Sequence, residues 1–392
     1  MIIGYLKQGL FGGTDALIER FISWANDNGY YCIEYNNALN NNIKVDILLM
    51  PTSSIKEYSL LRVRGEGARR VIIWAMGHGA FRAVFFRPDH WIKYSVLLKP
   101  FTWFIDIFLS RLIDNCSLVF TDSVGMYSDL KKNHIEMLMR FGSDSIFPIA
   151  IKTDPMVSAN SLNEVENFRF GWVGRVSKDF KLFPLVDLLK ELNKLNFQNG
   201  FSFSKFYIVG TGDGMPFLQN FISSERLSFD IELISHIEPD LLRGFLKENV
   251  DLVFSMGTSS LDVAMSTIPS VIVKPYSSVD SEVIDHVDKY RYVFESVGYS
   301  LGEFDGIGNR VIQKNKNLDS IIQDFVSEGK NLLGYKSYKY AMIYDENIVF
   351  PALIERMGKV RKAQVSVFYY IGIAFFFCIK GAIKLFGRRY ES

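Results

Sequence analysis

The chain has 392 residues, more than one usual hydrophobic core holds, so we expect two domains. It carries 44 Lys and Arg against 43 Asp and Glu, and this balance excludes a general attraction for nucleic acid. Three cysteines without metal-ligand spacing fit a reducing compartment, and the N-terminus lacks the pattern of a secretory signal. We therefore expect no nucleic-acid partner and a catalytic body in the cytoplasm.

The first 150 residues alternate apolar strand patterns with helix patterns. Strands are expected at 1–6, 30–35, 45–50, 71–75 and 117–121, and helices at 14–27 and 124–132. Such alternation predicts a parallel sheet with helices on both faces. A polar, turn-rich stretch at 153–167 is typical of a linker. We assign residues 1–152 to a first, acceptor-side Rossmann-like domain.

The same pattern restarts after the linker. Strands are expected at 168–173, 205–209, 230–234, 251–254 and 270–273, and helices at 182–195, 215–223, 239–247 and 260–266. We assign 168–344 to a second, nucleotide-sugar-binding Rossmann-like domain, followed by a crossover helix segment at 345–362. The fold class is therefore α/β with two doubly wound halves, in which ligands bind outside the carboxyl ends of the strands.

The stretch from Phe168 to Lys181 runs from an apolar strand into a glycine turn followed by two cations. Gly174 lets the backbone approach a ligand, while Arg175 and Lys181 can reach one doubly charged group from two sides. The pattern resembles the donor-binding signature of GT-B nucleotide-sugar glycosyltransferases of the group 1, family 4-like superfamily. That resemblance implies two domains facing a central cleft, with Arg175 and Lys181 catalytic on the donor diphosphate. The alternative interpretation is an ordinary strand end with solvated cations.

A second glycine turn follows the strand at 251–254. Four residues there place hydroxyls and backbone N–H groups before a helix: Gly257, Thr258, Ser259 and Ser260. The resemblance implies that they bind the donor, and that Asp262 takes the place of a glutamate that contacts the ribose. The alternative for Asp262 is a carboxylate favoured by the helix dipole. Phe254 stands where the family has another carboxylate, so a retaining and an inverting outcome both stay open.

The first half carries acceptor-side candidates. Gly12 and Gly13 resemble the family's N-terminal glycine loop, which faces the donor phosphates and the acceptor, and Asp15 stands where the family usually has glutamate. A simple capped turn is the alternative. His78 follows a strand where the family has a histidine near the acceptor, and a histidine can act as a base near neutral pH. A structural histidine is the alternative.

No Asp-x-Asp pair, Walker-type motif or zinc spacing occurs, so we expect a metal-independent reaction with no cofactor besides the nucleotide-sugar co-substrate. The resemblance implies a hexosyltransferase-type enzyme of bacterial cell-surface polysaccharide or lipopolysaccharide biosynthesis, acting on a glycan or polyprenyl-linked acceptor. Two alternatives stay open. One is a nucleotide-sugar 2-epimerase, and the other is a non-catalytic membrane-bound scaffold with a degenerate GT-B fold.

Two regions suggest a membrane surface. Residues 81–113 interleave cations with aromatic side chains, although a packed helix pair broken at Pro100 is the alternative. Residues 365–379 are nearly all apolar between basic flanks, and as a helix they would reach about 22 Å, short of the roughly 30 Å hydrocarbon core. We expect 363–392 to be a membrane-associating helix on the cytoplasmic face of the cell membrane, with a single span as the alternative.

Overall fold

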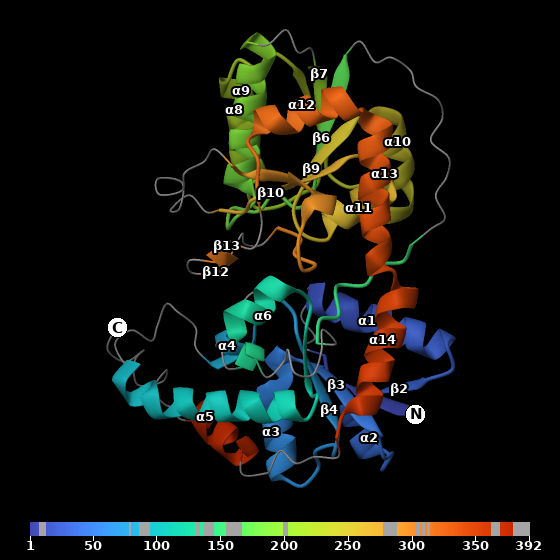
Figure 1. Ribbon diagram of the computed structural model, residues 1–392, viewed down its shortest axis with the longest axis vertical. Coiled ribbons are helices and arrows are strands. Elements are labelled where there is room, and N and C mark those ends of the chain that lie inside the picture. Colours follow the sequence, from blue (N-terminus) through green and yellow to red (C-terminus); the bar gives the residue numbers. More distant parts are fainter. Residues whose placement is uncertain are drawn as a thin grey trace. The chain divides into compact units, whose positions relative to one another are not determined.

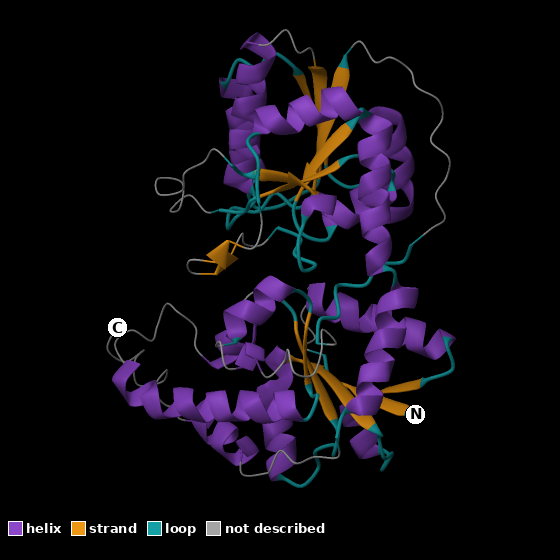
Figure 2. Ribbon diagram, viewed as in Figure 1, coloured by secondary structure: helices purple, strands orange, loops and turns teal. Residues whose placement is uncertain are grey.

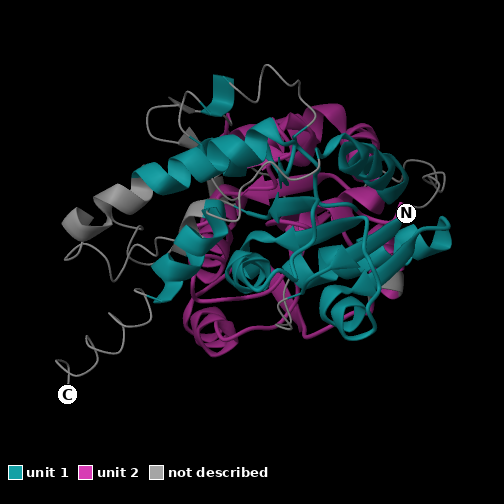
Figure 3. Ribbon diagram, turned by 90° about the horizontal axis from the view of Figure 1, so that it is seen from below, with its two compact units in different colours: residues 1–150, 346–392 teal, residues 151–345 magenta. Residues whose placement is uncertain are grey.

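A computed structural model describes residues 1–7, 13–77, 80–85, 95–130, 134–136, 145–153, 167–198, 203–276, 288–302, 306–307, 310–311, 314–361 and 369–378. The chain divides into two compact units, one of residues 1–150 with 346–392 and one of residues 151–345 (Figure 3). The backbone therefore passes from one unit to the other twice. Most of the expected linker, residues 154–166, lies outside the described residues.

Unit 1 is built on a parallel sheet in the order β2–β1–β3–β4–β5 (Figure 1). Its strands are β1 (Ile2–Tyr5), β2 (Tyr31–Glu34), β3 (Ile47–Pro51), β4 (Val71–Ala75) and β5 (Leu118–Phe120). Its labelled helices are α1 (Gly13–Asp27), α2 (Tyr35–Asn40), α3 (Ile55–Val63), α4 (Ala80–Phe85), α5 (Ser95–Asp114), α6 (Ser123–Asp129) and α14 (Glu346–Lys359). This strand order is doubly wound, with the switch point between β1 and β3.

Both faces of the unit 1 sheet are buried, and successive strand residues alternate between them. Leu48, Ile73 and Leu118 pack with α3, α5 and a helix at 369–378. Leu49, Ile72 and Val119 pack on the other face with α1 and α14, where the rings of Phe21 and Phe350 meet at 5.3 Å. Strands buried on both faces are what a parallel sheet requires, which explains their continuous apolar sequence.

Unit 2 contains a sheet in the order β11–β10–β9–β6–β7–β8, parallel except for the edge strand β11. Its strands are β6 (Phe168–Val173), β7 (Phe203–Val209), β8 (Asp230–Ile234), β9 (Leu252–Ser255), β10 (Ser270–Val273) and β11 (Tyr290–Tyr292), and a short hairpin joins β12 (Gly306–Ile307) to β13 (Arg310–Val311). The order is that of a dinucleotide-binding Rossmann sheet, with its switch point between β6 and β9.

Helices cover both faces of the second sheet (Figure 2). They are α8 (Leu182–Gln198), α9 (Met215–Ser224), α10 (Pro239–Asn249), α11 (Ser259–Met265), α12 (Leu318–Glu328) and α13 (Lys330–Ala341). Phe170 and Phe254 pack with α8 and α12, whereas Val173 and Val253 pack with α10 and α11 on the opposite face. In α8 the apolar residues recur every three or four positions, so the helix presents one continuous stripe to the sheet.

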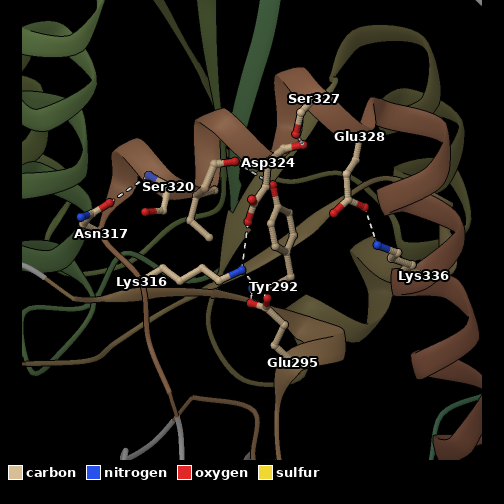
Figure 4. A network of polar contacts seen from close by, with 10 residues as sticks. Tyr292, Glu295, Lys316, Asn317, Ser320, Asp324, Ser327, Glu328 and Lys336 are labelled. Carbon is tan, nitrogen blue, oxygen red and sulfur yellow. Dashed lines mark hydrogen bonds and ion pairs between the residues drawn. The ribbon is translucent and has the colours of Figure 1, made fainter.

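A network of charges ties the edge strand β11 to α12 (Figure 4). The ammonium of Lys316 lies 2.5 Å from Glu295 and 2.9 Å from Asp324. Burial lowers the pKa of Lys316 and the two carboxylates raise it by more, so that its pKa lies above the ordinary value. The hydroxyl of Tyr292 donates to the carbonyl of Ile321 at 2.8 Å, and these contacts hold the only antiparallel strand of the described sheet in place.

Most expected elements are confirmed with bounds within a few residues. The strands expected at 168–173, 230–234 and 270–273 have those bounds, and the helix expected at 182–195 continues to Gln198. The alternative interpretation of residues 81–113, a helix pair broken at Pro100, is wrong about the break, because α5 continues through Pro100 from Ser95 to Asp114.

The C-terminal segment differs from expectation. Residues 363–368 and 379–392 lie outside the described residues. The described part does not support a separate membrane-associating helix, because residues 369–378 form a helix whose Tyr370, Ile373 and Phe376 are buried in the core of unit 1. Among the described helices, none combines the length and the apolar character that crossing a membrane requires. An apolar run of this length suits a core helix as well as an interfacial one, so the sequence alone does not distinguish the two.

Candidate functional site

The two loops that the sequence singled out begin side by side at the switch point of unit 2. Val173 at the end of β6 is paired in register with Ser255 at the end of β9. The loop of residues 174–181 therefore leaves the sheet next to residues 256–258, which lead into α11. Ligands of open α/β sheets bind at such a point, outside the carboxyl ends of the strands.

Gly174 lies at the centre of this arrangement. Its φ of +145° is one that side-chain-bearing residues rarely adopt. A Cβ built on Gly174 would lie 3.6 Å from Ser259 Oγ and 3.8 Å from Lys181 Nζ. A cation and a hydroxyl from two different loops thus converge on a stretch of backbone without a side chain, which is a suitable environment for a phosphate group.

The loop that follows β7 holds the backbone of the Gly174 turn in place. Gly174 donates its N–H to the carbonyl of Val209 at 3.0 Å, and Val176 donates to Thr211 at 2.9 Å. Gly210 lies so close that a Cβ there would be 2.1 Å from the carbonyl oxygen of Gly174. The glycine turn at 210–214 is therefore packed against the turn that carries the predicted cations.

Trp172 is a site residue that the sequence analysis missed. Its indole is fully buried, and Nε1 donates to the carbonyl of Gly174 at 3.3 Å. The sequence does show this tryptophan two residues before the glycine turn. A tryptophan in an apolar strand usually belongs to the core, however, so its contact with the turn was not predicted. The indole therefore both fills the core and orients the peptide that follows Gly174.

The start of α8 positions Lys181. The carbonyl of Ser177 accepts from the backbone N–H groups of Lys181 at 3.2 Å and Leu182 at 2.9 Å. The Lys181 side chain is partly buried, whereas Arg175 is exposed directly after Gly174. The buried hydroxyl of Ser177 has no hydrogen-bond partner within the described part of the chain. This loop therefore presents a cation held at a helix start, an exposed cation and an unsatisfied hydroxyl.

The predicted residues before α11 divide into two groups. Thr258 is exposed and Ser259 partly buried, so both can reach a ligand, and Gly257 has a φ of +69° in the same turn. Ser260 is fully buried, and its hydroxyl donates to the carbonyl of Gly257 at 2.6 Å. Ser260 therefore closes the turn. Asp262 is exposed in the first turn of α11.

The acceptor-side candidates are described only in part. Gly13 begins α1, and Asp15 lies in its first turn with 8% of its surface exposed. Gly12 and His78 lie outside the described residues. Phe254, where the family resemblance would place a carboxylate, is a fully buried strand residue whose ring lies 6.3 Å from that of Phe170.

A buried polar cluster flanks the same edge of the unit 2 sheet. The ammonium of Lys289, 2% exposed, lies 2.6 Å from Glu191 of α8, and the hydroxyl of Tyr290 donates to the same carboxylate at 2.8 Å. Tyr276, three residues past β10, donates to Asp187 of α8. Burial raises the pKa of Tyr276 and Tyr290, so both phenols stay neutral hydrogen-bond donors. The cluster therefore ties Tyr276, Lys289 and Tyr290 to α8.

Comparisons with known proteins address the fold. No protein-family model matches the chain, and no curated protein matches it in sequence. Among solved structures, the apo form of the lipopolysaccharide outer core galactosyltransferase WaaB matches with a TM-score of 0.53 and 11% identity, covering 91% of this chain and 99% of that one. An α-glucosyltransferase in complex with UDP and a 13-mer DNA matches with a TM-score of 0.48 and 10% identity, covering 91% and 99%. The pneumococcal O-GlcNAc transferase GtfA in complex with UDP and GlcNAc matches with a TM-score of 0.42 and 13% identity, covering 83% and 59%.

The two doubly wound units and the similarity to WaaB show that the chain has the GT-B fold of glycosyltransferases. The resemblance stated from the sequence is thereby confirmed at the level of fold. At 11% identity the similarity does not extend to a particular donor or acceptor.

Proposed function

We propose that the chain is a glycosyltransferase that binds a nucleoside diphosphate sugar at the switch point of unit 2. The proposal rests on one observation: Lys181 Nζ and Ser259 Oγ converge on the backbone of Gly174. When a sugar leaves its nucleotide, negative charge develops on the departing diphosphate. Lys181, Arg175 and the N–H groups of these loops stabilise that charge in the transition state.

Further residues complete the proposed site. Gly257, Thr258 and Ser259 contact the donor phosphates, and Asp262 contacts the ribose. In unit 1, Gly12, Gly13 and Asp15 serve the donor phosphates and the acceptor, and His78 is catalytic on the acceptor side. The reaction proceeds without a metal ion, a proposal that rests on the lack of an Asp-x-Asp pair in the sequence.

The acceptor in this proposal is a glycan or a polyprenyl-linked oligosaccharide of a bacterial surface polysaccharide, lipopolysaccharide included. Its support is the fold shared with WaaB, a lipopolysaccharide outer core galactosyltransferase. The test incubates the protein with a panel of nucleotide sugars and polyprenyl-linked or lipid A-linked acceptors, with and without a chelator. We expect a new glycolipid with equal yield in both conditions. Interconverted donor without transfer would identify an epimerase, and no turnover with any pair would favour a scaffold.

A membrane-facing surface is the second part of the proposal. Helix α5 and the helix at 369–378 pack together, with the rings of Phe104 and Tyr369 5.7 Å apart. Both helices also carry exposed apolar side chains, with Trp103 67% and Phe375 61% exposed. In the sequence, four basic residues and one acidic residue follow within the last fourteen positions. Exposed aromatic side chains, followed in the sequence by a net positive charge, suit the interface of an anionic bilayer.

We expect the double variant Trp103→Gln, Phe375→Gln to bind anionic vesicles at least about tenfold more weakly, because each ring loses apolar burial worth about 1.5–3 kcal/mol. Co-sedimentation with vesicles measures the change. These two side chains are better targets than a truncation at 363, which would also remove Tyr370 and Ile373 from the core. Ile348→Gln, at an exposed apolar position on α14, is the control. If Ile348→Gln weakens vesicle binding as much as the double variant does, the surface that carries Trp103 and Phe375 is not the membrane-binding one.

A further inference from the structure

An arginine-rich pocket lies at the edge of the unit 1 sheet that is opposite to the carboxyl ends of its strands. Val71, the first residue of β4, and Ser117, directly before β5, line it together with Tyr370 of the helix at 369–378. Its empty space amounts to about 240 Å³ including the part open to solvent, and the enclosed part is narrow. The pocket is therefore separate from the sheet edge at which doubly wound folds bind their nucleotides.

Three arginines line this pocket, and no acidic side chain does: Arg62, Arg69 and Arg361. They come from the end of α3, the loop before β4 and the segment after α14, so only the folded unit brings them together. None of the three forms an ion pair with a carboxylate among the residues that the structure describes. Three positive charges around one narrow space repel each other, and an anion between them removes that repulsion.

The neighbouring Arg70 has a different role from the arginines of the pocket. Its guanidinium donates to the carbonyls of Val360 at 3.0 Å and Gly358 at 3.1 Å, and so caps the C-terminal end of α14. Arg69, by contrast, is exposed and has no polar partner within the described part of the chain. Arg70 therefore stabilises the fold, whereas Arg69 only lines the pocket.

Arg62 is held in position for binding. Its Nη1 donates to the carbonyl of Gly67 at 3.2 Å, and its guanidinium carbon lies 5.5 Å from the centre of the Tyr370 ring. Its Nε is buried and lacks a hydrogen-bond partner among the described residues. A buried, unpaired N–H of a charged group carries a cost in free energy. A guanidinium fixed in this way is preorganised for a planar or tetrahedral oxyanion.

Neutral donors complete the lining. Asn115 and Ser117, each 3% exposed, add an amide and a hydroxyl. Burial raises the pKa of Tyr58 and Tyr370, so both phenols remain protonated at neutral pH. The hydroxyl of Tyr58 already donates to the carbonyl of Ala68 at 2.8 Å. The lining therefore offers the neutral donors of Asn115 and Ser117 beside the three cations and carries no negative charge.

We propose that this pocket binds a phosphate group, and that the group belongs either to a soluble phosphorylated molecule or to a lipid headgroup. Several N–H donors from arginine match the oxygens of a phosphate, and the narrow enclosed part favours a compact terminal group. The headgroup source is consistent with the helix that carries Tyr370, since its Ile371 and Phe375 are 48% and 61% exposed. The proposal does not depend on the donor site in unit 2.

The test compares Arg69→Gln and Arg361→Gln with the parent chain. Both side chains are exposed, so we expect both variants to fold, which circular dichroism checks. Calorimetric titration with inorganic phosphate and pyrophosphate should show an affinity about tenfold lower in each variant, the effect of one charge-assisted hydrogen bond. Arg64→Gln is the matched control, because Arg64 is exposed on the same segment and does not line the pocket. It should bind within about twofold of the parent.

A second experiment distinguishes a soluble phosphorylated ligand from a lipid headgroup. Vesicles of phosphatidylcholine with phosphatidic acid, which exposes a phosphomonoester, are compared with vesicles of equal charge containing phosphatidylserine. Preference for phosphatidic acid that is lost in the double arginine variant and is competed by phosphate assigns a lipid headgroup. Saturable phosphate binding without that preference assigns a soluble ligand. The proposal is overturned if the parent binds neither phosphate nor pyrophosphate, or if Arg64→Gln weakens binding as much as the pocket variants.

Discussion

Replacing Lys181 by alanine is expected to lower kcat/KM for sugar transfer by about 10²–10³-fold, the usual loss when one preorganised contact to a developing charge is removed. Its ammonium lies near Gly174, where the backbone leaves room for a diphosphate. The carbonyl of Ser177 fixes the start of α8, so the lysine is held in position before the donor binds. Because the side chain is only partly buried, the free energy of unfolding should change by less than about 1 kcal/mol.

The measurement combines steady-state transfer kinetics with urea unfolding of the same preparations. Lys194→Ala is the matched control, since it removes one positive charge from an exposed position on the same helix. Arg175→Ala should lose activity to a similar extent, because both cations act on one leaving group. Near-normal turnover in Lys181→Ala, with the protein folded, would remove the lysine from the mechanism.

Gly210→Ala should have the largest effect on stability and should abolish donor binding at the same time. The added Cβ would lie 2.1 Å from the carbonyl oxygen of Gly174, and Gly210 has a φ of +151°. Overpacking and backbone strain together should lower the free energy of unfolding by about 2–5 kcal/mol. Relief of the clash also requires the Gly174 turn to move, and this would displace the backbone that faces Lys181 and Ser259.

Gly244→Ala is the control for this substitution, because Gly244 is exposed in α10 and nothing lies within 4 Å of its Cβ position. There the same chemical change should raise stability by up to about 1 kcal/mol, since alanine favours a helix over glycine. Urea midpoints and nucleotide diphosphate titrations measure the two effects. A Gly210→Ala protein that keeps both the parent stability and the parent affinity would show that the two loops are not closely coupled.

The sequence predicted the framework of the second unit because strand, turn and helix are local properties. An apolar run ending in Gly174 fixed β6 and its turn, and the register that pairs Val173 with Ser255 follows from the order of the strands. The contacts that hold the Gly174 turn in place could not be predicted. They depend on the close approach of Gly210 and on the indole of Trp172, and neither residue type by itself implies such a contact.

Residue type alone also failed to separate structural from exposed positions. Ser259 and Ser260 are adjacent and chemically identical, yet one lies near Gly174 while the hydroxyl of the other closes its own turn. The arginine pocket gave no sequence signal, because Arg62, Arg69 and Arg361 are brought together by topology rather than by spacing. The apolar run at 365–379 was ambiguous for a different reason, since a core helix and an interfacial helix have the same composition.

The discontinuity of unit 1 affects how the protein emerges from the ribosome. Residues 1–150 are made first, but α14 and the helix at 369–378 supply part of the covering layer on each face of their sheet. Unit 2 is continuous in sequence and can finish folding as soon as its last residues leave the exit tunnel. Unit 1 therefore begins to emerge before unit 2 and is completed after it, and its apolar sheet depends on residues 346–378 for protection from aggregation.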